Sequence, residues 1–249
     1  INVGVAITAG KLGIGFTDTN IKVGSGALDS LTTGTHNTAV GHNALTANTS
    51  ANRNTAVGRH ALTANTTGED NVGIGYHALV ENTTGEDNVA VGSYALDANT
   101  TASNNVAIGY YALTSTVTGF NNVAVGVNAL YTNTASNNTA IGRDALKLST
   151  ADNCVAVGSL ALAANSTGAA NVAVGYGALN DNTTGNYNIA IGGGALDTNT
   201  TGDNNVAMGI NALTANTTAD NNTAIGYDAL TANTTGGSNT ALGKDALRA

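Results

Sequence analysis

The stretch Asn88-Val89-Ala90-Val91-Gly92-Ser93-Tyr94-Ala95-Leu96 decides the fold, because the chain repeats it along most of its length. The shared phrase is Asn-Val-Ala-Val-Gly, two variable residues, and then Ala-Leu. Its anchor glycine recurs fourteen times, at Gly24, Gly41, Gly58, Gly75, Gly92, Gly109, Gly126, Gly142, Gly158, Gly175, Gly192, Gly209, Gly226 and Gly243. Eleven intervals are 17 residues long and two are 16. A fixed period of this length predicts a stacked-repeat architecture.

The composition agrees with a thin core that is repeated many times. Of the 249 residues, 10% are charged and 4% are aromatic, and the formal net charge is −8. An ordinary domain has roughly 25% charged residues. Disorder is not expected, because every copy carries regularly placed aliphatic residues.

Composition and pattern also argue against several classes of protein. The sequence has no basic cluster, so we expect no nucleic-acid partner. No apolar run approaches the roughly 18–20 residues that span a membrane, so no insertion is expected. The single Cys154 excludes an intramolecular disulfide framework. The chain opens within the pattern at Ile1, and we expect it to be part of a longer polypeptide.

The residues before each anchor glycine predict a short strand. Counting from that glycine, position −1 is always aliphatic and position −3 is Val, Ile or Thr. These two share one face of a strand, and position −2 lies on the other face. Position −2 is Ala in twelve copies, with Lys22 and Gly73 as exceptions, so we infer that this face is also covered. We predict that it is a subunit interface, formed by Ala56, Ala90, Ala107, Ala124, Ala173 and Ala207.

The second half of each copy predicts a core leucine and a turn. Ala-Leu follows the variable pair in every copy, so the Leu is assigned to the core, and a single helical or 3₁₀ turn is expected there. Asn-Thr-Thr-Gly then supplies turn chemistry. Ala51, Ala102 and Ala219 replace that glycine in three copies, so a positive φ is not required at this position.

Asparagine occupies a fixed place before the strand in thirteen copies, and Cys154 replaces it in the fourteenth. In a solenoid, equivalent residues of successive coils lie about 4.8 Å apart. A second Asn opens the Thr-Thr turn in most copies. Stacked Asn amides are therefore expected to hydrogen-bond along each column. Fourteen coils give a rod on the order of 65 Å long.

We divide the chain into residues 1–20, an irregular capping segment, and residues 21–249, the tandem-repeat solenoid. Strand-like stretches in the first part, at residues 2–7 and 11–15, lie off the later period. Terminal repeats are usually atypical because they must cover an open edge.

The phrase Asn-Val-Ala-Val-Gly-x-x-Ala-Leu resembles the Ser-Val-Ala-Ile-Gly-x-x-Ser repeat of trimeric autotransporter adhesin heads, the YadA-like β-roll. With its 17-residue period and Asn-Thr-Thr-Gly turns, it is also similar to repeats of phage tail-fibre and trimeric surface-fibre proteins. The resemblance covers roughly residues 21–247. It implies a homotrimer in which small residues let three chains pack, on a virion, on a cell surface or otherwise outside the cell.

No residues suggest catalysis, and we predict that the protein is not an enzyme and has no cofactor or metal site. The turn carboxylates do not recur as the convergent pairs that acid–base chemistry needs. They leave calcium conceivable, but the Gly-Gly-x-Gly-x-Asp nonapeptide is missing. His60 and His77 share one position in adjacent coils and should stack, although no third metal ligand accompanies them.

The variable pair after the anchor glycine is the candidate binding surface. Tyrosine offers stacking area and a polar tip, so a Tyr-rich stripe on a regular scaffold favours binding of a receptor or glycan. The alternative is a solvated stripe with incidental tyrosines. The stripe consists of Tyr76, Tyr94, Tyr110, Tyr111, Tyr176 and Tyr227.

The sequence therefore predicts an all-β solenoid, or β-roll, of about fourteen 16–17-residue coils, as one chain of a homotrimeric fibre. Val, Ile and Leu would fill each coil, and Ala would lie between chains. The expected function is a structural fibre or shaft, with adhesion through the Tyr stripe. Two alternatives stay open: a self-assembling extracellular filament subunit, and a monomeric ice-binding solenoid with Thr-Thr columns.

Overall fold

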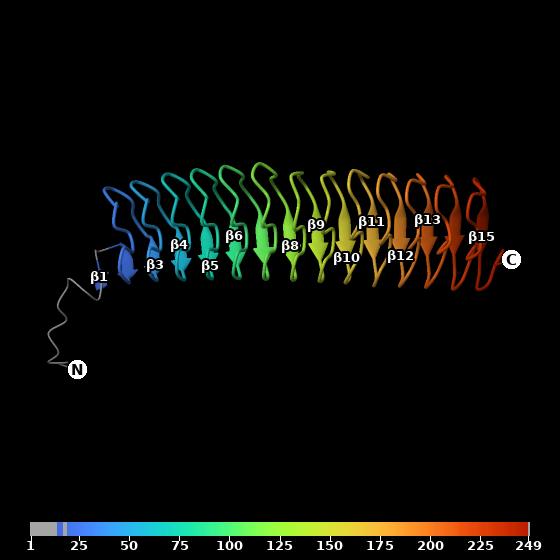
Figure 1. Cartoon of the computed structure of the whole chain (residues 1–249), viewed down its shortest axis with the longest axis horizontal. Helices are drawn as coiled ribbons and strands as arrows, with labels where there is room; N and C mark the ends of the chain where they lie inside the picture. The colour runs from blue at the N-terminus through green and yellow to red at the C-terminus, as the bar shows by residue number, and fades with distance from the viewer. Residues whose placement is uncertain (1–13, 17–18, 249) are drawn as a thin grey trace, which may run out of the picture.

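The computed structural model describes residues 14–16 and 19–248, which form one long β-solenoid (Figure 1). Fifteen three-residue strands form a single sheet in sequence order. The described residues contain no helix, and therefore none that is long and apolar enough to cross a membrane. The strands are β1 (Ile14–Phe16), β2 (Ile21–Val23), β3 (Thr38–Val40), β4 (Thr55–Val57), β5 (Val72–Ile74), β6 (Val89–Val91), β7 (Val106–Ile108), β8 (Val123–Val125), β9 (Thr139–Ile141), β10 (Val155–Val157), β11 (Val172–Val174), β12 (Ile189–Ile191), β13 (Val206–Met208), β14 (Thr223–Ile225) and β15 (Thr240–Leu242).

The fourteen strands β2–β15 are parallel and in register, so equivalent positions of successive repeats lie side by side. Ala90 pairs with Ala107, for example, and Ala107 with Ala124. The predicted all-β solenoid is confirmed. The two 16-residue copies keep this register, because their deletion falls in the turn.

The strand β1 precedes the first coil and runs antiparallel to β2, with Ile14 opposite Val23. This pairing covers the outer edge of β2. The predicted strand-like stretch at residues 2–7 lies outside the described residues, as does most of residues 11–15.

The interior of each coil is built from alanine and leucine, which corrects one prediction. The six alanines assigned to a subunit interface (Ala56, Ala90, Ala107, Ala124, Ala173 and Ala207) are all 0% exposed within a single chain. They belong to the same buried cluster as the leucines of the Ala-Leu pairs. At Gly73, which takes the alanine position in β5, an added Cβ would lie 3.2 Å from Leu62 Cγ. The leucine column is therefore what covers the alanine face, and these alanines cannot contact another chain.

The strand face at positions −3 and −1 points outward, so the prediction that Val and Ile fill each coil is also wrong. Ile108, Ile141 and Met208 are about 40% exposed, whereas the alanine in the middle of each of these strands is fully buried. Small side chains are needed inside, because the leucine column already occupies the narrow interior.

The buried leucines have left-handed backbone, and no helical turn forms there. Leu62, Leu96 and Leu213 have φ values of 52°, 51° and 52° and are fully buried. This conformation costs an L-residue roughly 1–2 kcal/mol. Burying a Leu side chain contributes about 1.5–3 kcal/mol, which offsets the strain. The predicted helical or 3₁₀ turn is therefore replaced by a tight left-handed bend.

Two buried asparagine columns run along the solenoid, as predicted. In the first, the backbone N–H of Asn88 donates to Asn71 Oδ1 at 3.0 Å, and the side-chain Nδ2 of Asn88 donates to the Ala102 carbonyl at 2.9 Å. In the second, Asn99 Nδ2 donates to Asn82 Oδ1 at 2.7 Å. The amides satisfy turn carbonyls that would otherwise be buried without partners.

Candidate binding surfaces

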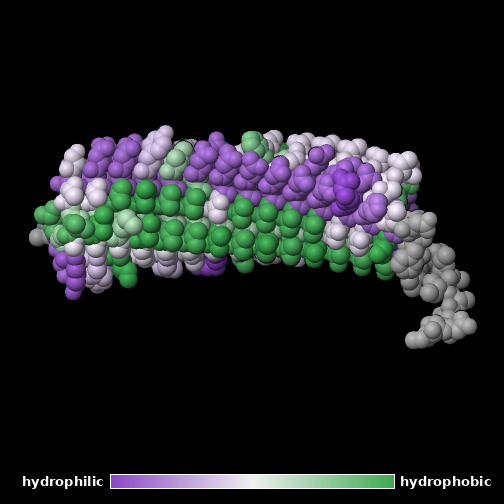
Figure 2. All heavy atoms as spheres, turned by 180° about the vertical axis from the view of Figure 1, so that it is seen from behind, coloured by the Kyte–Doolittle hydropathy of each residue, from purple (hydrophilic) through white to green (hydrophobic). Residues whose placement is uncertain are grey.

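The outward side chains of the sheet form an apolar band, defined here as the first and third residues of β2–β15. Figure 2 shows the band as two adjoining columns that run along the rod. Its third-residue column is aliphatic in every strand, and its first-residue column is Val, Ile or Thr. Individual members are half-exposed, with Ile108 at 40% and Met208 at 39%. A solvated sheet face normally carries polar residues, so this surface is unusual for a chain in water.

The carboxylates of the turns belong to a different part of the coil and are partly neutralised there. Arg53 reaches the next turn, where its Nη2 lies 2.6 Å from Glu69 Oε2 and its Nε lies 2.6 Å from Asp70 Oδ1. The hydrogen bond from Arg53 lowers the pKa of the Asp70 carboxyl. These carboxylates contribute to a surface ion network between coils.

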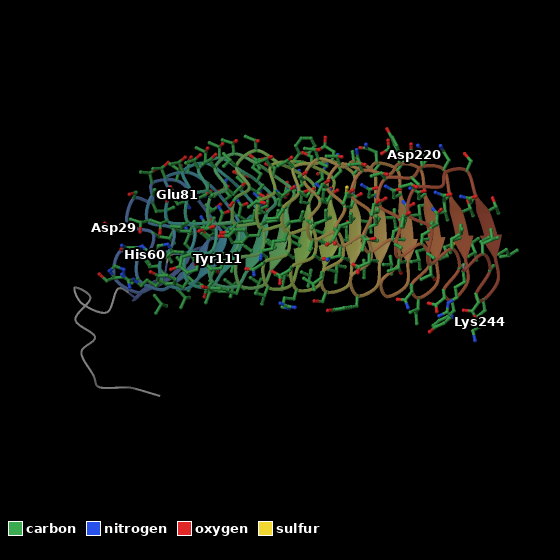
Figure 3. All side chains as sticks on the ribbon, turned by 45° about the vertical axis from the view of Figure 1, so that its right-hand side comes forward. Asp29, His60, Glu81, Tyr111, Asp220 and Lys244 are labelled. Atoms are coloured by element: carbon green, nitrogen blue, oxygen red, sulfur yellow. The ribbon has the colours of Figure 1, made fainter. Side chains whose placement is uncertain are left out.

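Eight rings after the anchor glycines touch in one continuous series, here called the aromatic strip. It spans the six coils from Gly41 to Gly126 and consists of His42, His60, His77, Tyr76, Tyr94, Tyr110, Tyr111 and Tyr131. Ring centroids of neighbouring members lie between 4.1 and 6.3 Å apart. In Figure 3, His60 and Tyr111 mark two points along it on the same side of the rod.

The predicted tyrosine stripe is thus only partly assembled. Tyr76, Tyr94, Tyr110 and Tyr111 belong to the strip, whereas Tyr176 and Tyr227 lie in later coils and their rings do not join it. The strip also takes in three histidines and Tyr131. The predicted stacking of His60 and His77 is confirmed, with centroids 5.1 Å apart.

Tyr131 was missed because it is not in the variable pair. It lies five residues after its anchor glycine, yet its ring is 5.9 Å from that of Tyr111 in the preceding coil. Only the path of the coil around its corner shows that these two positions adjoin. The histidines carried a usable signal, since they occupy the same variable pair as the tyrosines.

Side chains of the strip have shifted pKa values, and the strip carries little charge. Hydrogen bonding to Tyr110 raises the pKa of Tyr111 to about 12, with burial adding to the shift. Burial, followed by repulsion from Arg59, lowers the pKa of His60. The Arg59 guanidinium lies 5.8 Å from the Tyr76 ring centroid, within cation–π range. The strip therefore presents hydroxyl groups and ring faces in a largely neutral setting.

Among residues 14–16 and 19–248, no three His, Cys, Asp or Glu side chains cluster in a way that could hold a metal ion. The imidazoles of His60 and His77 pack edge to face, with 67° between their planes. Their arrangement is that of packed rings within the strip.

Comparisons of the chain with protein-family models, with curated proteins and with solved structures give no match.

Proposed function

We propose that the protein is a structural fibre or shaft segment in which copies of the chain pack through the apolar band. The observation that supports this proposal is the band itself, which runs the length of the solenoid without a charged residue in its two columns. Monomeric soluble proteins rarely expose apolar patches larger than a few hundred Å². A partner that covers such a long band is best supplied by an equally long surface, namely a second copy.

The size of the band suits a stable association. Fourteen strands about 4.8 Å apart and three residues wide give a face of about 65 by 10 Å, or ~650 Å² on each chain. Three such faces turned toward a common axis bury up to ~1,950 Å² in total, which is the size of a specific interface. The aliphatic side chains of neighbouring bands can interdigitate around that axis, as side chains do between packed sheets.

A homotrimer around a central axis is the arrangement we favour, as the resemblance to trimeric surface fibres implies. Each chain would turn its band toward the axis and its turns and aromatic strip outward. The backbone is bonded from coil to coil on several sides, as in the Val89 N–H to Asn105 carbonyl bond of 2.8 Å and the Leu96 N–H to Ala112 carbonyl bond of 3.1 Å. Such bonding suits a stiff spacer on a virion or cell surface.

Charge placed on the band tests this proposal. The double variant Val91→Lys/Val125→Lys puts two ammonium groups on half-exposed positions that the single chain leaves partly in solvent. Sedimentation velocity should show the assembly reduced to single chains, because each buried charge would lack a partner. The matched control Thr101→Lys/Thr184→Lys, at exposed turn positions, should keep the wild-type sedimentation coefficient.

Assembly that survives in the band variant would show that the chains meet elsewhere. A wild-type chain that is monomeric and also depresses the freezing point relative to the melting point would instead favour the ice-binding alternative. In that case the flat band, and not the Thr-Thr turns, would be the surface to mutate.

A further inference from the structure

The rings of the aromatic strip are not required by the coil that carries them. Gly193 and Gly194 occupy the variable pair of a later coil, whose backbone is bonded in the same way. The Gly194 N–H donates to the Tyr176 carbonyl at 3.0 Å, and the Tyr94 N–H donates to the Tyr76 carbonyl at 2.9 Å. A coil without rings thus closes as well as a coil with them.

Four rings of the strip stand where the backbone favours glycine. The second variable residue has a left-handed conformation, with φ near 60° at His60, His77, Tyr94 and Tyr111. Nine other coils place Gly, Asn or Asp at this position, the types that tolerate positive φ. Tyr94 and Tyr111 are not of these types, so each adds backbone strain of roughly 1 kcal/mol or more. Burial offsets this cost at the core leucines, whereas binding of a ligand would explain it at these two half-exposed tyrosines.

We propose that the aromatic strip binds a neutral polysaccharide whose chain lies along the solenoid axis. Equivalent rings recur coil by coil, with centroid spacings of 5.1 Å for His60 and His77 and 5.0 Å for Tyr94 and Tyr111. That spacing is comparable with the length of one hexose unit, so successive sugars meet successive rings. The C–H face of a pyranose packs on a ring, and the Tyr hydroxyls bond the sugar hydroxyls.

Charge favours a neutral ligand over an acidic one. Within the described residues, the cation that contacts a ring of the strip is Arg59. Asp97 lies beside the strip and is half-buried, with Thr114 Oγ1 donating to its carboxylate. The whole chain carries a formal charge of −8, which would repel a polyanion.

The exposure and length of the strip also suit a polymer. Tyr76 and Tyr110 are 37% and 48% exposed, so part of each side chain is accessible to a ligand. The six coils give a platform about 25 Å long.

Native gels that contain hydroxyethylcellulose, galactomannan or laminarin test the inference with the full chain. Wild-type protein should be retarded by at least one of these neutral polymers. Tyr94→Asn and Tyr111→Asn should each weaken the retardation up to about tenfold, the effect of one lost stacking contact. Asn occupies this position at similar φ in other coils, as at Asn43 and Asn211, so both variants should fold.

The matched controls are Tyr176→Ser and Tyr227→Ser, at exposed tyrosines outside the strip. Serine stands at the equivalent position in coils such as that of Ser93. Both controls should be retarded like wild type. The inference is overturned if no neutral polymer retards the wild-type chain, if control and strip variants lose retardation alike, or if only dextran sulfate causes retardation.

Discussion

At the residue scale, the fold depends on positions where only glycine fits. The anchor glycines have φ values between 117° and 143°, a region that L side chains rarely adopt. Along the column, an added Cβ would lie only 2.3–2.6 Å from the carbonyl oxygen of the next anchor glycine. Repetition of this contact explains why the anchor glycine never varies.

Gly92→Ala is therefore expected to destabilise the solenoid strongly. Its Cβ would meet the Gly109 carbonyl oxygen at 2.4 Å, and φ there is 139°. We expect a loss of about 3 kcal/mol or more in the free energy of unfolding, measured by urea denaturation. The control Gly193→Ala, whose Cβ would have no heavy atom nearer than 3.9 Å, should change it little. Equal losses in the two variants would refute this account of the glycine column.

Cys154 is the weak point of the first asparagine column. Elsewhere the Asn side-chain oxygen accepts the next Asn N–H, as Asn171 Oδ1 does from Asn188 at 2.8 Å. The Cys154 thiol donates to the Gly168 carbonyl oxygen at 3.3 Å and so replaces the bond that Asn Nδ2 makes in other coils. As an acceptor for the N–H of the next Asn, however, sulfur is weak. Cys154→Asn should raise the free energy of unfolding by about 1 kcal/mol. A neutral or destabilising result, with Cys154→Ser as the comparison, would contradict this reading.

At the element scale, the repeat period was enough to predict the strands, their order and the asparagine columns. It could not show which strand face is the inside, because a period of two separates the faces without orienting them. The alanines looked like a contact surface between chains. The left-handed bend at the leucines turns the leucine column under the alanines. A leucine in the sequence does not signal such a bend. The aromatic strip was half predicted for a similar reason, since Tyr131 joins it across a corner.

The stacked histidines make the strip sensitive to acid. Burial first, and then Arg59, His77 and His42, lower the pKa of His60 below its usual 6.5. The unfolded chain therefore takes up this proton more readily than the folded chain. The folded state with a neutral His60 is therefore at its most stable above pH 6.5. It loses stability as the pH falls from there toward the lowered pKa of His60 in the folded chain.

Thermal unfolding of wild type and His60→Asn between pH 7.5 and 5 checks this expectation. The Tm of wild type should fall further over that interval than the Tm of His60→Asn. Asn is chosen because it tolerates the positive φ of this position. The variant His36→Asn, at an exposed histidine outside the strip, should follow wild type. Identical pH profiles for wild type and His60→Asn would show that His60 is not a source of acid sensitivity.

At the scale of the whole molecule, stability should behave as a sum over coils and the contacts between neighbours. Removing residues 172–188 deletes one complete 17-residue copy and joins equivalent positions. Far-UV circular dichroism should show that this shorter chain folds. Removing residues 172–179 instead breaks the register and should unfold or split the rod. A full-copy deletion that fails to fold would contradict the independence of the coils.

The native mass of the wild-type chain, measured by multi-angle light scattering, tests the central claim that the apolar band joins copies of this chain. One chain has a mass of 24.5 kDa. A packed band predicts a multiple of that value, with three chains as the expected assembly. A mass of one chain at every concentration tested would contradict the claim, since the band would then be left open to solvent.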